Sequence, residues 1–288
     1  MKRYLVIVPI LFLGVAFFGL AKVSEEIQLK RGQAVEEGAP PNKDQIQLEN
    51  CAPDMPNVNP KANANPGGLT PIEVDSPVNS RPDTQPINEA PNITETILLN
   101  VPFASQAPFG DWKDERQQDG CEEASVIMAM LWAKGQKGVT RDYALSKILD
   151  ISDFEAKNYD TFHDTGAKET LDRIIKDYFK YENAEVKYDV AKEDLISELA
   201  NGNLIIAPMN GKALKNPNFT DGGPERHMLV IKGYDPVKKE FITNDPGTRK
   251  GEGYRYGEDL FYAAMRDYLC GYHVPITEMH KNIIVVKK

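Results

Sequence analysis

The uneven distribution of aromatic residues and prolines sets the strongest limit on how this chain can fold. Of the 288 residues, 22–96 contain no Phe, Tyr or Trp, yet they hold 11 of the 20 prolines. A segment of this composition cannot bury enough apolar surface to offset the entropy lost on ordering, so we expect a disordered, proline-rich linker there. A folded core is therefore expected only in residues 97–288, a length that suits one domain.

The first residues of the chain have the composition expected of a targeting or anchoring signal. Residues 4–20 are almost wholly apolar and follow the basic pair Lys2 and Arg3. This run is at the short end for a bilayer-spanning helix, and residues 19–21 offer a small-residue cleavage site. Residues 1–21 are thus expected to be either a signal peptide or a membrane anchor. In both cases the rest of the chain is expected outside the cytoplasm, in the cell envelope, either membrane-anchored or secreted.

The net charge and the positions of histidine and cysteine argue against nucleic acid and metal ions as partners. The net charge of −9 argues against nucleic acid, because phosphate binding requires a basic face. The four histidines are scattered and no Cys-x-x-Cys or His-x-x-x-His spacing occurs, so we expect no metal or other cofactor. Three cysteines leave at least one thiol free or paired between chains, and a bond between Cys51 and Cys270 is left open.

Within residues 97–288 the sequence predicts helices first and strands second. Helical spacing of apolar residues indicates helices at 121–134, 141–149, 166–179 and 192–200. Apolar runs between turn residues indicate strands at 97–103, 185–190, 204–209, 227–234, 240–243 and 282–286. This order is typical of an α+β fold, in which N-terminal helices pack on a mainly antiparallel sheet.

Cys121 is the first candidate functional residue. A polar loop before it gives way to apolar residues at helical spacing, among them Val126, Ile127 and Met130, which places the thiol on the first turn of a helix. Unpaired backbone N–H groups and the positive end of the helix dipole favour a thiolate there and offer donors to an oxyanion. A small buried apolar side chain is the alternative for any single cysteine.

His227 is the second candidate, because it opens a predicted apolar strand. The next predicted strand returns antiparallel and ends in Asn244 and Asp245. In a hairpin the end of the second strand lies beside the start of the first, so Asn244 or Asp245 is expected next to His227. Such a neighbour would orient a general base. The alternative is a capping histidine beside an ordinary turn.

Taken in order, these segments resemble a papain-fold cysteine peptidase. More narrowly, the chain is similar to the double-glycine leader (bacteriocin-processing) peptidases and their stand-alone relatives over residues 98–248. The resemblance implies a nucleophile, a base that also acts as acid, an orienting carboxylate and an oxyanion donor. The residues at the matching positions are Cys121, His227, Asp245 and Gln106, respectively.

Several features of the sequence leave alternatives open. Glu122 and Glu123 stand where the family commonly has Gly-Pro, and two carboxylates there would raise the pKa of Cys121. The interval between Gln106 and Cys121 is long, so a second glutamine could donate to the oxyanion instead. The residues left open are Gln117 or Gln118 as the donor, Asn244 in place of Asp245, and Trp112 as a substrate-binding residue or as a side chain packed over the core.

The implied function is an exported thiol hydrolase that cleaves a peptide or related amide bond with a Cys-His-Asp triad. Its expected partners are a peptide or protein substrate and, if the N-terminal segment is not cleaved, the membrane. Specificity for double-glycine leaders is not implied, because those peptidases are usually fused to a transporter. Two alternatives remain: an acyltransferase that uses the same thiol, and a catalytically inactive peptide-binding module.

Overall fold

This computed structural model describes residues 93–288 of the chain. The expected signal or anchor segment at 1–21 and the expected linker up to residue 92 lie outside the described residues, so both stay predictions. Cys51 lies outside them as well, so its pairing with Cys270 stays open. Among residues 93–288, no helix combines the length and the apolar character needed to cross a bilayer.

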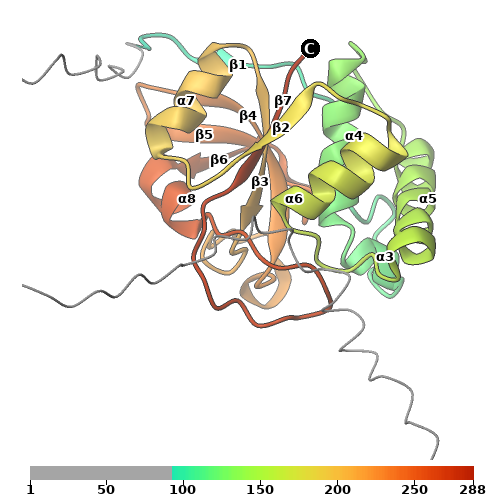
Figure 1. The fold of residues 1–288 in the computed structure, drawn as a ribbon. Coiled ribbons are helices and arrows are strands. Elements are labelled where there is room, and N and C mark those ends of the chain that lie inside the picture. The colour runs from blue at the N-terminus through green and yellow to red at the C-terminus, as the bar shows by residue number, and fades with distance from the viewer. Residues whose placement is uncertain (1–92) are drawn as a thin grey trace, which may run out of the picture. The chain divides into compact units, whose positions relative to one another are not determined.

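A seven-stranded sheet with antiparallel pairing throughout forms the centre of the domain (Figure 1). A short strand, β1 (Ile97–Leu98), pairs with the C-terminal part of β4. A Cβ atom at Gly233 of β4 would lie 2.3 Å from the carbonyl oxygen of Ile97, so only glycine permits this approach. The other strands follow the order β2 (Ala184–Lys187), β7 (Ile283–Val286), β3 (Leu204–Met209), β4 (His227–Asp235), β5 (Glu240–Asn244) and β6 (Glu252–Gly257).

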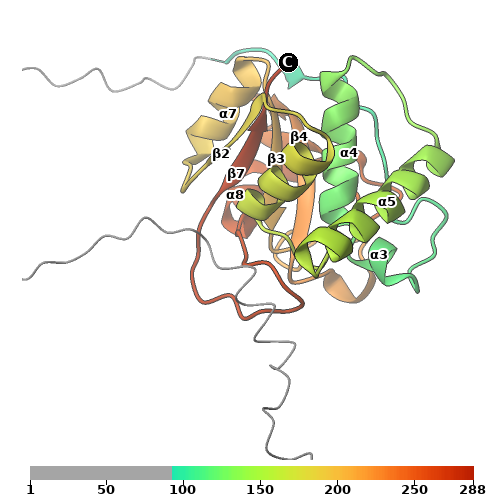
Figure 2. The same cartoon turned by 45° about the vertical axis from the view of Figure 1, so that its right-hand side comes forward.

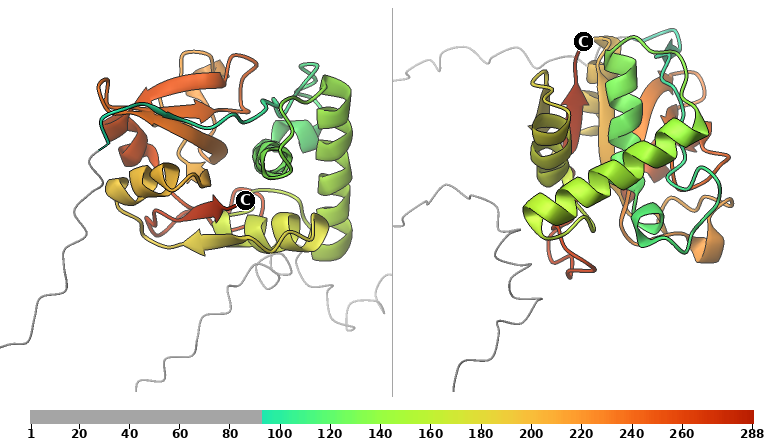
Figure 3. Two further views of the ribbon diagram at one scale, coloured as in Figure 1. Left: turned by 90° about the horizontal axis from the view of Figure 1, so that it is seen from above. Right: turned by 90° about the vertical axis from the view of Figure 1, so that its right-hand side faces the viewer.

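Helices cover both faces of this sheet (Figure 2). On one face α4 (Cys121–Ala133) packs along β4, and α5 (Arg141–Tyr159) and the π-helix η1 (Thr170–Tyr178) pack against α4. Seen from above, α4 lies between the sheet and α5 (Figure 3). The opposite face carries α7 (Lys192–Ala200) and α8 (Glu258–Ala264). The remaining helices are short: α3 (Glu115–Gln118), α6 (Ala167–Glu169) and the 3-10 turn η2 (Thr220–Gly222).

Two hydrophobic cores result from the alternation of side chains along the strands. In β3, Leu204 and Ile206 belong to the core under α4, whereas Ile205 and Ala207 belong to the core under α7 and α8. Every residue of β3 is buried, which explains why its sequence is a continuous apolar run. The structure therefore has helices on both faces of an antiparallel sheet, and the predicted α+β class is confirmed.

Several predicted elements differ in extent from the observed ones. The predictions for α4, α7, β3 and β4 are confirmed to within one residue, but α5 continues ten residues past the predicted end, to Tyr159. The predicted helix at 166–179 is divided into α6 and η1. The predicted strand at 97–103 is paired as a strand only at its first two residues. Beyond them the N–H of Leu99 still donates to the backbone oxygen of Lys232 at 2.8 Å, and Asn244 binds the carbonyl oxygens of Val101 and Pro102 with its side chain. The sequence did not predict β6 and α8.

Candidate active site

Cys121 begins α4 at the end of the sheet where β4 also begins. The Ser125 hydroxyl of α4 donates to the backbone oxygen of Met228 at 3.2 Å, which fixes the start of the helix against the start of the strand. Gly120 connects α3 to α4. A Cβ atom there would lie 2.5 Å from the backbone oxygen of Arg116, so the tight connection requires glycine. The fold thereby brings Cys121 and His227 to one place.

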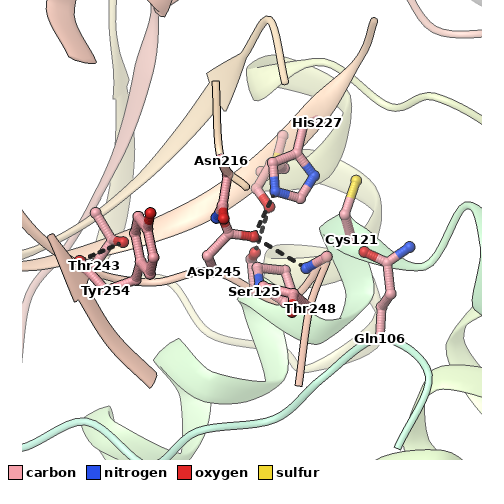
Figure 4. Close-up of polar contacts among 12 residues, drawn as sticks. Gln106, Cys121, Ser125, Asn216, His227, Thr243, Asp245, Thr248 and Tyr254 are labelled. Carbon is pink, nitrogen blue, oxygen red and sulfur yellow. Dashed lines mark hydrogen bonds and ion pairs between the residues drawn. The ribbon is translucent and has the colours of Figure 1, made fainter. Parts of the chain in front are cut away.

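His227 and Asp245 form a buried pair. Nε2 of His227 lies 2.8 Å from Oδ1 of Asp245, and their side chains are 1% and 0% exposed. The ring of Phe219 meets the imidazole edge-on, with centroids 5.4 Å apart. In Figure 4 the sulfur of Cys121 lies beside the imidazole, on the side of the nitrogen that faces away from Asp245. The imidazole is thus located between a thiol and a carboxylate.

Asp245 accepts hydrogen bonds at both carboxylate oxygens. Oδ1 also accepts from the backbone N–H of Gly247 at 3.1 Å, and Oδ2 accepts from the phenol of Tyr256 at 2.6 Å and the amide of Asn216 at 3.4 Å. Burial opposes ionisation, but the charge of His227 and the hydrogen bonds together hold the pKa of Asp245 below its ordinary value. The carboxylate therefore stays ionised beside the imidazole.

Asn244, the residue before Asp245, binds backbone groups with its side chain. Its Nδ2 donates to the backbone oxygens of Val101 and Pro102, each at 3.2 Å, and its Oδ1 accepts from the N–H of Gly253 at 3.1 Å. The residue is fully buried and pairs with Val230 in the hairpin. Because these contacts occupy its amide, Asp245 is the residue of the two that contacts His227.

Gln106 lies next to Cys121, with its amide oxygen turned toward the sulfur (Figure 4). Its Nε2 donates to the backbone oxygens of Gln117 at 3.0 Å and Gln118 at 2.7 Å, while Oε1 is buried without a hydrogen-bond partner among residues 93–288. Its backbone N–H donates to Pro246, next to Asp245, at 3.0 Å. Gln117 and Gln118 therefore contact Gln106 through their backbones.

The two glutamates after Cys121 are both buried. Oε2 of Glu122 accepts the thiol hydrogen of Cys121 at a sulfur–oxygen distance of 2.9 Å. Oε1 of Glu123 accepts from Ser152 at 2.8 Å, on the side of α5. Burial raises the pKa of the Cys121 thiol well above its ordinary value, and the charge and hydrogen bond of Glu122 raise it further. The structure agrees with the effect that the sequence predicted for this pair.

A cleft of about 850 Å³ opens beside Gln106 and Gly247. Trp112 lines it with 40% of its surface exposed, so this side chain faces the cleft and is not covered by the domain core. The lining of this cleft also includes Gln118, Pro217, Asn218, Phe219, Thr220, Asp221, Gly223, Pro224, Thr248, Arg249 and Lys250.

Among residues 93–288, no cluster of three or more His, Cys, Asp or Glu has an arrangement suited to a metal ion.

Sequence reasoning missed three polar residues of the site. Tyr256 and Asn216 contact Asp245, and the phenol of Tyr268 donates to Oε1 of Glu122 at 2.7 Å. Tyr268 and Glu122 are 146 positions apart, so no local pattern could have linked them. Tyr256 lies on β6, a strand that was itself not predicted.

The chain was compared with solved structures, with curated proteins and with models of protein families. Among solved structures, the chain is similar to a protein from Bacillus anthracis that is provisionally named a C39-like peptidase. The two sequences are 16% identical, the similarity covers 67% of this chain and 98% of that one, and the TM-score is 0.38. No curated protein matches the chain. The model of the Peptidase_C39 like family matches residues 98–269, more than half of the sequence, and the chain therefore belongs to this family.

Proposed function

We propose that this chain is a cysteine peptidase in which Cys121 is the nucleophile, His227 the base and acid, and Asp245 the orienting carboxylate. The observation that carries the proposal is the buried contact of 2.8 Å between His227 and Asp245, with Cys121 on the other side of the imidazole. Membership of a peptidase family supports an amide bond as the target.

The chemistry follows from these positions. Cys121 passes its proton to the imidazole nitrogen that faces away from Asp245, and the thiolate attacks the amide carbonyl. His227 then protonates the leaving amine, a thioester remains on Cys121, and water hydrolyses it with His227 again as base. Asp245 holds the other nitrogen as an N–H donor and stabilises the imidazolium.

The oxyanion of the tetrahedral intermediate forms at the start of α4. The backbone N–H of Cys121 and the positive end of the helix dipole are suited to stabilise it. Gln106 can add a donor after its terminal amide rotates, because Oε1 and not Nε2 faces the sulfur here. The side chain must then move away from the backbone oxygens of Gln117 and Gln118, because Oε1 would otherwise face these two oxygens, and the amide exchanges these partners for the oxyanion.

The cleft supports a peptide as substrate. Trp112 and Phe219 offer aromatic surface, while Arg249, Lys250 and Asp221 offer charges at its exposed rim. The groove thus offers aromatic surface together with many hydrogen-bonding and charged groups, which suits the mixed apolar and polar surface of a peptide. Trp112 is the side chain that we assign to substrate binding.

We also propose that this domain acts outside the cytoplasm, in the cell envelope, at the end of the proline-rich segment. The apolar residues 4–20 after a basic start support export. Fusion of a periplasm-active or extracellular-active reporter enzyme after residue 288 tests this location, because such a reporter gives a signal only when exported. A reporter that is active only in the cytoplasm would contradict it.

Labelling of the full-length protein tests the proposed peptidase. Iodoacetamide and an epoxide probe of the E-64 type should modify Cys121 at neutral pH, and peptide mass spectrometry separates Cys121 from the other two cysteines. His227→Ala should reduce the labelling rate by at least tenfold, since the imidazole is the proton acceptor. Equal rates in the two proteins would contradict the proposal.

A second candidate, a peptide-binding module without turnover, is favoured by one observation. The thiol of Cys121 donates to Glu122, and its pKa is raised by burial and by that carboxylate, which opposes formation of a thiolate. If Cys121→Ala binds envelope peptides as tightly as the unaltered protein and the unaltered protein cleaves none of them, the binding module is the better description.

A further inference from the structure

A buried acid, Glu122, connects Cys121 to Tyr268 through hydrogen bonds. Tyr268 donates to Oε1 of Glu122 at 2.7 Å, and Oε2 of Glu122 accepts from Sγ of Cys121 at 2.9 Å. Glu122 is 2% exposed and Tyr268 is 5% exposed. The carboxyl group therefore contacts the reacting atom directly, from the interior of the domain, and both of its oxygens are engaged.

The surroundings of Glu122 favour its protonated form. Burial raises the pKa of Glu122 to about 8, the charge of Asp164 adds to the rise, and the contacts with Cys121 and Tyr268 limit it. The charge of Arg173 on η1 lowers the pKa of the neighbouring Glu155. The titratable groups that face Glu122 are Cys121 and Glu123 on α4, Glu155 on α5, Asp164 after α5, and Tyr268 in the C-terminal segment.

We propose that Glu122 is a further residue of the catalytic site, one that sets whether Cys121 is a thiol or a thiolate. As a carboxylic acid it donates its O–H to the sulfur and stabilises the thiolate. As a carboxylate it accepts the S–H and keeps the thiol protonated. This role rests on the proposed function, because it presumes that Cys121 is the nucleophile.

The positions of the Glu122 and Cys121 protons differ below and above pH 8. Below pH 8 the carboxyl group keeps its proton, the proton of Cys121 moves to His227, and the Glu122 O–H turns to the negative sulfur. Above pH 8 Glu122 releases its proton to solvent, so that a thiolate would place two negative charges 2.9 Å apart. The thiol hydrogen then stays between sulfur and Oε2.

Glu122→Gln in the full-length protein separates these two forms. The amide of Gln has the same shape, can donate Nε2–H to the sulfur at every pH, and can accept from Tyr268 with its oxygen. Glu123→Gln is the matched control, because Glu123 is equally buried on the same turn but contacts Ser152. The measurement is the iodoacetamide labelling rate of Cys121 between pH 6 and 10.

The unaltered protein should show a break near pH 8, where the rate stops rising with pH as Glu122 ionises. Glu122→Gln should lose the break and label about tenfold faster at pH 9, since each unit of thiol pKa changes the thiolate fraction about tenfold. Glu123→Gln should keep the break. A Glu122→Gln profile that coincides with the unaltered one, or a folded variant that no longer labels, overturns the proposal.

Two further variants, Tyr268→Phe and His227→Ala, separate the role of Glu122 from the peptidase mechanism. Tyr268→Phe removes a donor to the ionised carboxylate, so it should move the break to higher pH; an unmoved break overturns the proposal even if Glu122→Gln does not fold. His227→Ala reports on the peptidase mechanism separately. If His227→Ala slows labelling but Glu122→Gln changes nothing, only the role of Glu122 fails, and if His227→Ala changes nothing, the peptidase mechanism fails.

Discussion

Tyr256 donates its phenolic hydrogen to Oδ2 of Asp245 at 2.6 Å, so that Oδ1 is directed to His227. Burial and the charge of Asp245 raise the pKa of the phenol, which therefore remains a donor over the whole working range of pH. Tyr256 lies on β6 and Asp245 follows β5, so the register of this strand pair determines how the carboxylate meets the imidazole.

Tyr256→Phe should slow labelling of Cys121 on the order of tenfold at pH 6, because a hydrogen bond to a charged group is lost. The pKa of Asp245 should rise, so the acidic side of the pH profile should move to higher pH. Tyr254→Phe is the control, since Tyr254 packs against Tyr256 but is not among the hydrogen-bond partners of Asp245. Identical profiles for the two variants would show that Tyr256 only fills space.

Asp245→Asn should lower peptidase activity by ~10³ to 10⁴, because an amide can hold the imidazole in the wrong tautomer and cannot stabilise an imidazolium. Activity is read as the rate of acyl-enzyme formation with a peptide ester or amide probe. The thermal midpoint of the variant should be reported beside it. A loss of less than tenfold in a folded variant would remove Asp245 from the mechanism.

Asn244→Ala should instead affect stability. The change leaves two buried carbonyl oxygens and one N–H without their partner, so the free energy of unfolding should fall by about 3 kcal/mol. Urea denaturation at pH 7 measures this loss. If the variant keeps its stability but loses labelling of Cys121, then Asn244 and not Asp245 orients His227.

The sequence predicted the parts of the site that depend on local patterns. A strand that begins at His227 and a hairpin that returns to Asp245 follow from a short apolar run and a turn, and the helix after Cys121 follows from its spacing. The contacts of Tyr256, Asn216 and Tyr268 depend on how distant segments pack, which no local pattern contains. The choice between Asn244 and Asp245 also required the structure, because both lie at the end of β5.

The elements that the sequence missed have physical reasons as well. β6 contains two glycines and two charged residues, so it shows little of the apolar alternation that indicates a strand. It is nevertheless ordered by pairing with β5 and by the packing of α8. The predicted strand at 97–103 was too long because the carbonyl oxygens of Val101 and Pro102 accept from the side chain of Asn244, and because Pro102 lacks an N–H to donate to a neighbouring strand.

Gly247→Ala should displace the imidazole of His227. A Cβ atom at this position would lie 2.9 Å from Cε1 of His227, 3.0 Å from Phe219 and 3.3 Å from Oδ1 of Asp245. We expect labelling of Cys121 to fall by at least tenfold, because a shift of the base by a fraction of an ångström disrupts proton transfer. Gly257→Ala is the matched control, since no atom lies within 4 Å of its Cβ position. Equal labelling rates would mean that the site tolerates the displacement.

The buried glutamates should make the protein less stable as pH rises. Burial raises the pKa of Glu122 from 4.5 to about 8, and burial and the charge of Glu155 raise that of Glu123 well above its ordinary value. The folded state therefore holds protons that the unfolded state releases, so stability is highest below about pH 4.5 for these groups and is lost up to pH 8 and beyond. Other carboxylates with lowered pKa values, such as Asp245, act in the opposite direction only near pH 4 and below.

Between pH 5.5 and 8.5 the shift of Glu122 alone should thus lower the free energy of unfolding by on the order of 3 kcal/mol, measured by urea denaturation. Glu123→Gln should flatten this dependence, because Oε2 of Glu123 has no hydrogen-bond partner among residues 93–288 and a neutral amide carries no charge to bury. Glu225→Gln serves as the exposed control and should leave the slope unchanged. A slope that is the same in all three proteins would mean that these glutamates are ionised in the folded state at neutral pH, and that the interior of the helical layer accommodates their charge.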